Sequence, residues 1–484
     1  MALLAGMPLS CATNPVTGEK QLSLVSEQQE IGLGKETAEE VQQSIGLYPD
    51  PRVAAYVDGI GKRMAASSER PNLPWQFQVV DDDAVNAFAL PGGPVYVTRG
   101  LLTHLNSEAE LAAVLGHETA HITAKHSVNQ LSKAQLAQLG LGLGAVLKPE
   151  WAKYGQLAGA GLQIMFLRFS RDHEREADDL GFKYMQAQGY DPHAMVTTFQ
   201  TLDRVSQSGE GGRLPAWLAT HPDPGDRVAA AQRRIETQQA AAQPGSGTGG
   251  AGQAVKRDEY LAAIDGMTFG PDPRQGYFKG RSFFHPEMRF RMDFPEGWKT
   301  LNTHQAVGAV APAKDGVVQL GMAKVGLSPD AALKEFLAKE GVQAATATPL
   351  QIAGQPALTS GFTAKTDQGE EVSGVVAFFT HGGRTLGALA LAPKDKATAH
   401  EAAFRGTLES FQALNDPAAL NVQPARVQLV TVPSEMTVDA FNARFPSTVP
   451  VEQVALINGV ERNGTFKAGQ KAKRVIGGMG PSGG

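Results

Sequence analysis

The pattern H-E-T-A-H at residues 117–121 constrains this chain more than any other stretch, because its side chains converge only on a helix. One helical turn separates His117 from His121, so both imidazoles point to the same place. Two such neutral nitrogens can bind one zinc ion, with Glu118 beside them to move a water proton. A chance match to this pattern has odds of roughly one in a hundred, so a third ligand must be found.

The helix that carries this pattern has a start signal of its own. Ser107 is followed three residues later by Glu110, which is typical of a capping box, so we expect the helix to begin at Glu108. Apolar residues recur at helical spacing through Ile122 and predict one buried side.

A second helix, expected over residues 171–185, offers the third ligand. Glu174 and Asp178 lie one helical turn apart on it. A carboxylate from a second helix completes three protein ligands and leaves one position for water. Asp178 can accept the other ring N–H of a zinc-bound histidine. Glu176 competes with Glu174 for the ligand role. It lies about 200° around the helix from Glu174, so it cannot share the face that carries both Glu174 and Asp178. The other interpretation of these acidic residues is a solvated face of the helix.

Length and composition limit the remaining possibilities. A chain of 484 residues predicts about three domains, and 42% hydrophobic with 19% charged residues is typical of globular proteins. The net charge of −5, without a basic run, argues against a nucleic-acid partner. Because Cys11 is the single cysteine, there is no disulfide within the chain, and zinc must use histidine and carboxylate ligands.

The start of the chain resembles an export signal. A short apolar run over residues 3–10 precedes Cys11, which is typical of a bacterial lipoprotein acceptor, and residues 12–18 would form its tether. Pro8 departs from that pattern, and an unpaired thiol in a leader is the alternative.

No stretch reaches the ~18 apolar residues of a transmembrane helix, so we expect membrane contact only through a lipid anchor. The weaker apolar stretches 136–147 and 157–169 are predicted to be buried helices near the site, with a shallow membrane contact as the alternative.

A strand with a Pro-Gly-Gly turn precedes the metal-binding helix. Strands are expected at residues 77–80, 86–89 and 94–98. The middle strand is either part of a simple hairpin or an edge strand beside the metal, against which an extended peptide pairs. The candidate substrate-binding residues are Asn86, Ala87, Phe88 and Ala89.

These motifs together resemble the HtpX and CAAX-prenyl-protease type of zinc metallopeptidases (gluzincins), and in layout the soluble periplasmic BepA-like and LoiP-like members. The resemblance covers about residues 23–240 and includes residues 86–93 and 220–227. It implies that His117, His121 and Glu174 bind one Zn²⁺ ion and that Glu118 is the general base.

The resemblance also implies roles for His221 and Arg227. In BepA-like members a histidine in this His-Pro segment approaches the zinc, takes the water position and switches activity off. Elsewhere in the family this histidine and the following arginine face the transition state, which gives both residues a catalytic role. An ordinary turn at a helix start is the alternative.

The resemblance implies a zinc-dependent endopeptidase of the bacterial cell envelope that acts on misfolded or unassembled proteins. We expect a periplasmic protein and a candidate outer-membrane lipoprotein, with protein substrates and with peptidoglycan or outer-membrane assembly proteins as candidate partners. The alternatives are a non-proteolytic chaperone or assembly factor with a latent zinc site, and a peptidoglycan-associated hydrolase.

The predicted fold class is α+β and multidomain. Residues 289–298 resemble the opening of PsbP-like domains, and residues 427–475 resemble a LysM module, although Ser434 and Glu435 stand where such modules have Gly-Asp. The predicted divisions are a leader and tether (1–24), a mainly helical zincin-type peptidase domain with a small antiparallel sheet (25–238), a flexible linker (239–256), an α+β domain (257–415) and a βααβ LysM-like module (426–476).

Overall fold

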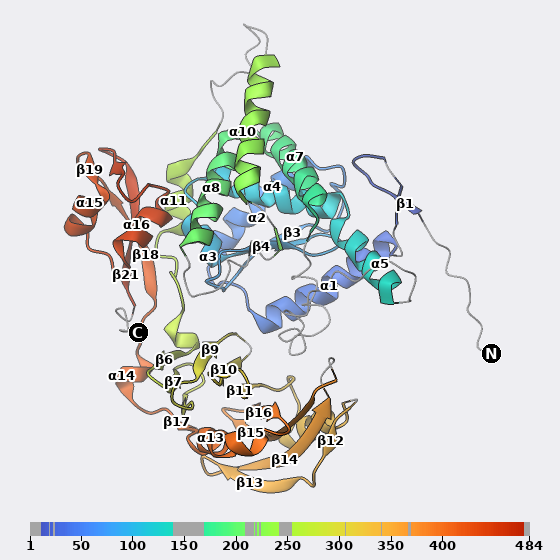
Figure 1. The fold of residues 1–484 in the computed structure, drawn as a ribbon. Coiled ribbons are helices and arrows are strands. Elements are labelled where there is room, and N and C mark those ends of the chain that lie inside the picture. The colour runs from blue at the N-terminus through green and yellow to red at the C-terminus, as the bar shows by residue number, and fades with distance from the viewer. Residues whose placement is uncertain are drawn as a thin grey trace. The chain divides into compact units, whose positions relative to one another are not determined.

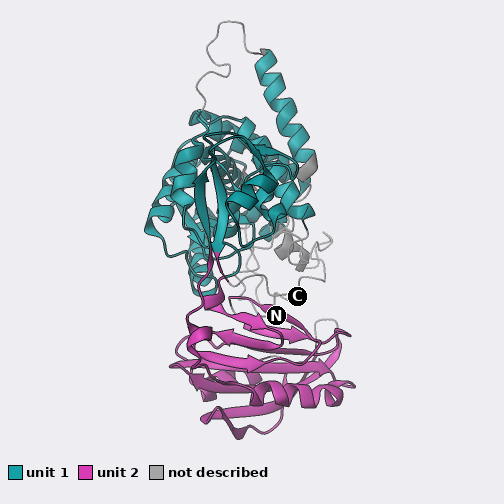
Figure 2. Cartoon of the chain, turned by 90° about the vertical axis from the view of Figure 1, so that its left-hand side faces the viewer, with its two compact units in different colours: residues 1–271, 426–476 teal, residues 272–425, 477–484 magenta. Residues whose placement is uncertain are grey.

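The computed structural model describes residues 11–18, 20–22, 25–138, 169–208, 217, 220–221, 224–241, 254–304, 306–339, 341–365 and 369–478. The chain forms two compact units (Figure 2): residues 1–271 with 426–476, and residues 272–425 with 477–484. Helices and several antiparallel sheets make up these units, so the predicted α+β, multidomain class is confirmed at that level.

Unit 1 contains most of the described helices (Figure 1). These helices are α1 (Glu27–Ser44), α2 (Pro51–Ala66), α3 (Arg99–His104), α4 (Glu108–Thr123), α5 (His126–Gln138), α7 (Arg171–Ala187), α8 (His193–Gln207), α10 (Pro224–Ala241), α11 (Arg257–Ile264), α15 (Val438–Arg444) and α16 (Val451–Ile457). The strands are β1 (Cys11–Thr13), β2 (Lys20–Leu22), β3 (Gln76–Val80), β4 (Ala87–Ala89), β5 (Pro94–Thr98), β18 (Ala425–Thr431), β19 (Met436–Thr437), β20 (Thr465–Phe466) and β21 (Lys471–Gly477).

The small sheet of unit 1 is mixed, so the predicted antiparallel sheet is wrong in one pairing. The strand order is β3-β5-β4; β4 and β5 form the predicted antiparallel hairpin, whereas β3 pairs with β5 in parallel. The tight turn holds β4 on one edge of β5, so β3 takes the other edge. Gly92 enables this turn, because its φ is +77° and a β-carbon there would lie 2.6 Å from the Ile31 backbone.

The predicted metal-binding helix is α4, and all 16 of its residues are buried. Helices α2, α7 and α8 pack against it. Ser107 caps α4 by accepting from the Glu110 N–H, but the Glu110 carboxylate bonds to the Asn106 N–H and not to that of Ser107. The predicted capping box is therefore only half formed. A helix buried on all sides keeps bulk water from the side chains it carries.

The βααβ module at the end of the chain belongs to unit 1. Strands β18 and β21 pair, and α15 and α16 lie between them in the sequence. The fully buried Lys473 donates through Nζ to the carbonyls of Thr103 (2.9 Å) and Leu105 (2.7 Å). Leu456 of α16 joins the same hydrophobic core as α4. The module thus satisfies the carbonyls at the end of α3, directly before α4 begins.

Helix α11 also lies in unit 1, although our prediction assigns residues 257–271 to the second domain. Tyr260, Leu261 and Ile264 are buried in the core of unit 1, and the Tyr260 hydroxyl donates to the Leu102 carbonyl (2.6 Å). Of the predicted linker, residues 242–253 lie outside the described residues.

The apolar stretches 136–147 and 157–169 lie almost wholly outside the described residues as well. Among the residues that are described, no helix is both long enough and apolar enough to cross a membrane.

Unit 2 is built on long antiparallel strands. Its large sheet has the order β12-β14-β15-β16-β11-β10-β9, with β13 paired to β14, and a second sheet has the order β17-β8-β7-β6. The helices are η3 (Pro273–Gln275), α12 (Pro329–Leu337), α13 (Ala397–Glu409) and α14 (Pro417–Leu420). The strands are β6 (Tyr277–Lys279), β7 (Ser282–His285), β8 (Phe290–Asp293), β9 (Lys299–Asn302), β10 (Ala306–Val310), β11 (Val317–Met322), β12 (Gln343–Ala344), β13 (Thr348–Ile352), β14 (Gln355–Lys365), β15 (Glu371–His381), β16 (Arg384–Pro393) and β17 (Gln412–Ala413).

His104 should make the stability of unit 1 sensitive to acid. Its Nδ1 donates to the Gly100 carbonyl (2.7 Å), so Nε2 accepts from Gln453 of the module (3.3 Å), and burial lowers the pKa of His104 to about 4. An unfolded histidine binds a proton below about pH 6.5, so the folded state loses up to about 3 kcal/mol from this residue as the pH falls from 6.5 to 4. Urea unfolding over this range should show a steeper loss for the wild type than for His104→Gln; equal slopes would contradict the assignment.

Candidate metal centre

Two helices of unit 1 cross at a pair of glycines. Gly116 of α4 faces Gly181 of α7, and a β-carbon on Gly181 would lie 2.9 Å from the His117 backbone nitrogen. Glycine inside a helix costs about 1 kcal/mol relative to alanine, so its presence here is explained by the close approach of the two backbones. This crossing brings Glu174 of α7 beside His117 and His121 of α4.

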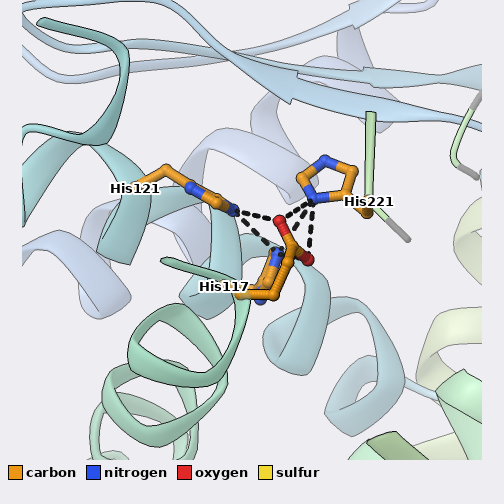
Figure 3. A group of neighbouring side chains, drawn as sticks. His117, His121 and His221 are labelled. Atoms are coloured by element: carbon orange, nitrogen blue, oxygen red, sulfur yellow. Dashed lines mark hydrogen bonds and ion pairs between the residues drawn. The ribbon is translucent and has the colours of Figure 1, made fainter. Parts of the chain in front are cut away.

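Four side chains converge at this crossing. One donor atom each from His117, His121, Glu174 and His221 lies within 4.8 Å of the others, and each side chain is at most 3% exposed. Figure 3 shows the three imidazoles directed toward one point. The structure therefore brings the three predicted zinc ligands together and adds His221 to them.

The spacing of these donors fits a zinc ion. His117 Nε2 lies 3.0 Å from His121 Nε2 and 3.3 Å from His221 Nδ1, and the Glu174 carboxylate lies 3.6 Å from each of the first two nitrogens. Donors placed at zinc-ligand distances on the corners of a tetrahedron are roughly 3.3 Å apart. Nitrogen and carboxylate oxygen are also the donor types that zinc takes in proteins.

Arg227 and Asp178 lie directly behind the cluster. Arg227 donates through Nε and Nη2 to Asp178 (2.9 and 2.6 Å), and its Nη1 lies 3.3 Å from Glu174 Oε2. Asp178 Oδ1 lies 2.9 Å from Nδ1 of His117, and Arg227 Nη2 approaches the same nitrogen at 3.2 Å. A cation on Nε2 would select the Asp178 contact, because Nδ1 then carries the proton.

The carboxylates of this cluster are held in their ionised forms. Burial alone would raise the pKa of Asp178, but the charge of Arg227 and the contact with His117 lower it to about 2. Burial likewise opposes ionisation of Glu174, yet the neighbouring His221 and Arg227 lower its pKa below the ordinary value. Both groups are therefore charged at neutral pH, as a ligand and a hydrogen-bond acceptor need to be.

Glu118 is a third carboxylate of this site, and it is fully buried. Neither of its oxygens has a hydrogen-bond partner among the described residues, and Oε1 lies 3.6 Å from His221 Nε2. Burial raises the pKa of Glu118 to about 7. A carboxyl group poised near neutral pH can both take and return a proton.

Aromatic rings cover the cluster. Trp217 stacks on His221 with ring centroids 4.1 Å apart, and Phe169 stacks on His121 at 4.0 Å. His221 Nδ1 lies 3.0 Å from Glu174 Oε1. Burial would lower the pKa of His221, but Glu174 and Glu118 raise it. His221 is therefore buried together with the three predicted ligands and contacts Glu174 and Trp217.

Several members of this site carry no signal that our sequence reasoning used. They are Gly116 and Gly181 at the crossing, His126 behind His121, and the covering rings of Phe169 and Trp217. Two signals in the sequence could have indicated some of them. Isolated glycines inside helical patterns could have predicted a close helix crossing, and a histidine five residues after His121 could have predicted a further contact at the site. Of the two glutamates that competed as ligands, Glu174 lies in the cluster, whereas Glu176 bonds to His126 (3.1 Å).

Strand β4 contacts α4 and carries three of the predicted substrate-binding residues, and Asn86 directly precedes it. Asn86 accepts from the Thr98 N–H (3.0 Å), and the Leu90 N–H donates to the Pro94 carbonyl (2.8 Å). Because hydrogen-bonded and non-bonded pairs alternate in an antiparallel ladder, Ala87 and Ala89 turn their backbone groups away from β5. No other described strand pairs with that outer edge.

Comparison with known proteins identifies the family to which the chain belongs. Peptidase family M48 matches residues 51–235. The mitochondrial metalloendopeptidase OMA1 of Schizosaccharomyces pombe is 32% identical over 243 residues, which cover 49% of this chain and 69% of that protein. The chain belongs to peptidase family M48. The predicted membership in a metallopeptidase family is confirmed.

Other M48 relatives are longer than the shared region. The beta-barrel assembly-enhancing proteases of Yersinia pestis and Escherichia coli K12 are 32% identical over 229 residues and 31% identical over 234 residues. Each match covers 46% of this chain, and the chain spans about half the length of these relatives (46% and 47%).

Solved structures add no argument for the rest of the chain. A cyanobacterial PsbP from Synechocystis covers 27% of this chain and 91% of its own, with 12% identity and a TM-score of 0.23. The PsbP-like and LysM-like assignments stay predictions.

Asp178→Asn should weaken metal binding by about 10- to 100-fold, because an amide replaces the carboxylate that holds Nδ1 of His117. Competition with a chelator of known affinity measures this change. Asp179→Asn is the matched control, since that neighbouring carboxylate is 66% exposed and pairs with Arg234 on the surface. Equal affinities for the two variants would refute a role of Asp178 at the metal centre.

Proposed function

We propose that this M48 chain is a zinc-dependent endopeptidase of the bacterial cell envelope that cleaves misfolded or unassembled proteins. The observation that supports this proposal best is the convergence of three imidazoles and Glu174 next to the buried carboxylate of Glu118. Two relatives are named for β-barrel assembly, which favours β-barrel precursors and other outer-membrane assembly proteins as substrates or partners.

His117, His121 and Glu174 would hold the metal. Two imidazoles and one carboxylate are a ligand set that catalytic zinc sites use, with a fourth position left for water. A bound zinc ion supplies Lewis-acid activation of water and of the peptide carbonyl. Asp178 orients His117 in this arrangement, through the contact at Nδ1.

Glu118 would move the proton. As general base its carboxylate takes a proton from the attacking water, and as general acid it returns that proton to the leaving amine nitrogen. The lack of hydrogen-bond partners among the described residues leaves both oxygens available for these transfers. For the developing oxyanion we assign Nη1 of Arg227, which lies against Glu174 without hydrogen-bond geometry.

Strand β4 would align the substrate. A peptide that pairs with its outer edge receives hydrogen bonds from the backbones of Ala87 and Ala89, whatever the peptide's sequence. Asn86 and Phe88 turn their backbone groups toward β5 and therefore hold the strand in place. Recognition through the main chain suits an enzyme that acts on many unfolded proteins.

His221 would act as a plug. With Nδ1 in the donor cluster and Nε2 facing Glu118, this one ring covers both the fourth ligand position and the general base. Withdrawal of His221 would free both at once. We propose that the enzyme is self-inhibited in this conformation and that substrate or a partner protein releases it.

Two other functions compete with this proposal. A chaperone or assembly factor with a latent zinc site would bind unfolded proteins without cutting them, and a peptidoglycan-associated hydrolase would use the LysM-like module to bind glycan. We place the protein in the periplasm, with Cys11 as a candidate lipid anchor to the outer membrane. Neither alternative accounts for a buried Glu118 that accepts no hydrogen bond from the described residues, on a helix that contacts an edge strand suited to a peptide.

Glu118→Gln should retain the metal and lose peptide cleavage, because an amide cannot accept the water proton. Metal content by elemental analysis and cleavage of casein or of an unfolded β-barrel precursor measure the two properties. Cleavage by the wild type that a chelator does not abolish, or full cleavage by Glu118→Gln, would refute a zinc peptidase. Cleavage of purified peptidoglycan in place of protein would support the hydrolase.

His221→Ala should raise basal cleavage of an unfolded substrate and weaken metal binding. If the plug favours the closed state by about 1.4 kcal/mol, its removal raises the rate about tenfold. The control is His193→Ala, which removes an exposed histidine that pairs with Asp191. A lower rate with unchanged metal affinity would assign His221 to the transition state and not to inhibition.

A further inference from the structure

A second histidine stands behind the zinc ligand His121. Nδ1 of His126 lies 2.9 Å from Nδ1 of His121, on the side of the ring away from the donor cluster. His126 is fully buried, and its Nε2 lies 3.1 Å from Glu176 Oε2. These contacts form a continuous line of hydrogen-bonding groups from the Glu176 carboxylate to the imidazole of His121.

The chemistry of these groups fixes the direction of each hydrogen bond. The carboxylate of Glu176 can only accept, so Nε2 of His126 carries the hydrogen and donates it. Nδ1 of a neutral His126 then accepts, and its donor is the Nδ1–H of His121. The remaining nitrogen of His121, Nε2, is left with a lone pair that points into the donor cluster.

The backbone between the two histidines is shaped for this contact. Helix α4 ends at Thr123, and α5 begins at His126. Lys125 between them has a φ of +60°, in the left-handed region that a lysine seldom adopts. With this backbone between the two helices, the His126 ring lies against His121, and His173 stacks on the His126 ring with centroids 4.3 Å apart. Strained backbone of this kind persists where the surrounding contacts hold it.

We propose that Glu176 and His126 are positioning residues that fix the tautomer and the orientation of His121 for metal binding, with Asn14 holding the outer end of the line. This inference rests on the proposed function, because it assigns a task only in a protein that binds metal. It also explains two polar residues of α5 and α7 that lie close to the site without reaching the metal.

Asn14 connects the line to the segment that follows Cys11. Its Nδ2 donates to Glu176 Oε1 (3.0 Å), and its Oδ1 accepts from the Val16 N–H (2.8 Å). The second bond sets the orientation of the amide, so the contact with Glu176 is a donated hydrogen bond and not its reverse. Asn14 is 2% exposed, which makes this N-terminal segment part of the wall around the metal centre.

A double-mutant cycle in the full-length protein tests the line. Zinc affinity is measured by chelator competition for the wild type, His126→Phe, Glu176→Ala and the double variant. Each single variant should lose about 10- to 100-fold. Because Glu176 acts through His126, the double variant should lose no more than His126→Phe alone. Asn14→Leu should produce a smaller loss in the same direction.

Two controls separate positioning from simple packing. His126→Gln should recover much of the affinity, because its amide oxygen and nitrogen reproduce the spacing of the two ring nitrogens. Asp172→Ala removes an exposed carboxylate from α7, the helix that carries Glu176, and should leave the zinc affinity unchanged. The thermal stability of the metal-free proteins is measured in parallel, since a purely structural role would lower it equally for His126→Phe and His126→Gln.

The outcomes distinguish this inference from the proposed function. Wild-type affinity in a folded His126→Phe variant, or losses that add in the double variant, would overturn the positioning role and leave the peptidase proposal intact. If the wild type binds zinc no more tightly than a variant lacking both His117 and His121, the proposed function itself is refuted, and the positioning role is refuted with it. Should His126→Phe not fold, the zinc affinities of Glu176→Ala and His126→Gln are compared with that of the wild type. A clear loss for Glu176→Ala and a smaller loss for His126→Gln support the positioning role, and wild-type affinity for Glu176→Ala overturns it.

Discussion

The close approach of α4 and α7 is the constraint on which the rest of the metal centre depends. At Gly116 and Gly181 the two backbones are separated by less than the room a side chain needs. Any β-carbon there would push α7 outward and move Glu174 and Asp178 away from His117 together. The contact between the two glycines therefore sets both the spacing of the donor atoms and the distance between Asp178 and Nδ1 of His117. Packing, not polar attraction, provides this precision, since close-packed helices resist small shifts.

Burial of this crossing creates an electrostatic problem that the surrounding side chains solve. Glu174 is buried, the Asp178 side chain is 16% exposed, and one guanidinium, Arg227, contacts both carboxylates. Removing one member would leave an uncompensated buried charge, which is more costly than the net stability of the set. Glu118, by contrast, accepts no hydrogen bond from the described residues, and burial raises its pKa to about 7. Glu174 and Asp178 are thus held in place by Arg227, whereas the carboxylate of Glu118 stays available for proton transfer in the proposed mechanism.

Much of the fold was predictable because its signals are local. Capping and acidic-residue patterns placed α4 and α7 within a few residues, and the spacing of His117 and His121 predicted their convergence. The parallel pairing of β3 and the packing of α11 depend on contacts between distant segments. His126 escaped prediction because its contact with His121 depends on the left-handed backbone of Lys125, which no spacing rule predicts.

The proposed closed state of the site is consistent with how differently the four donors are held. His117, His121 and Glu174 sit on helices that are locked by the glycine contact and by the Arg227–Asp178 pair. His221 lies outside both helices: its backbone N–H donates to the Trp217 carbonyl (2.8 Å), its ring stacks on Trp217, and its Nδ1 lies 3.0 Å from Glu174. Displacement of His221 would therefore leave the crossing of α4 and α7 intact. In the proposed mechanism, a substrate that enters along β4 competes with this one ring, and not with the packing of the helices, for access to the metal and to Glu118.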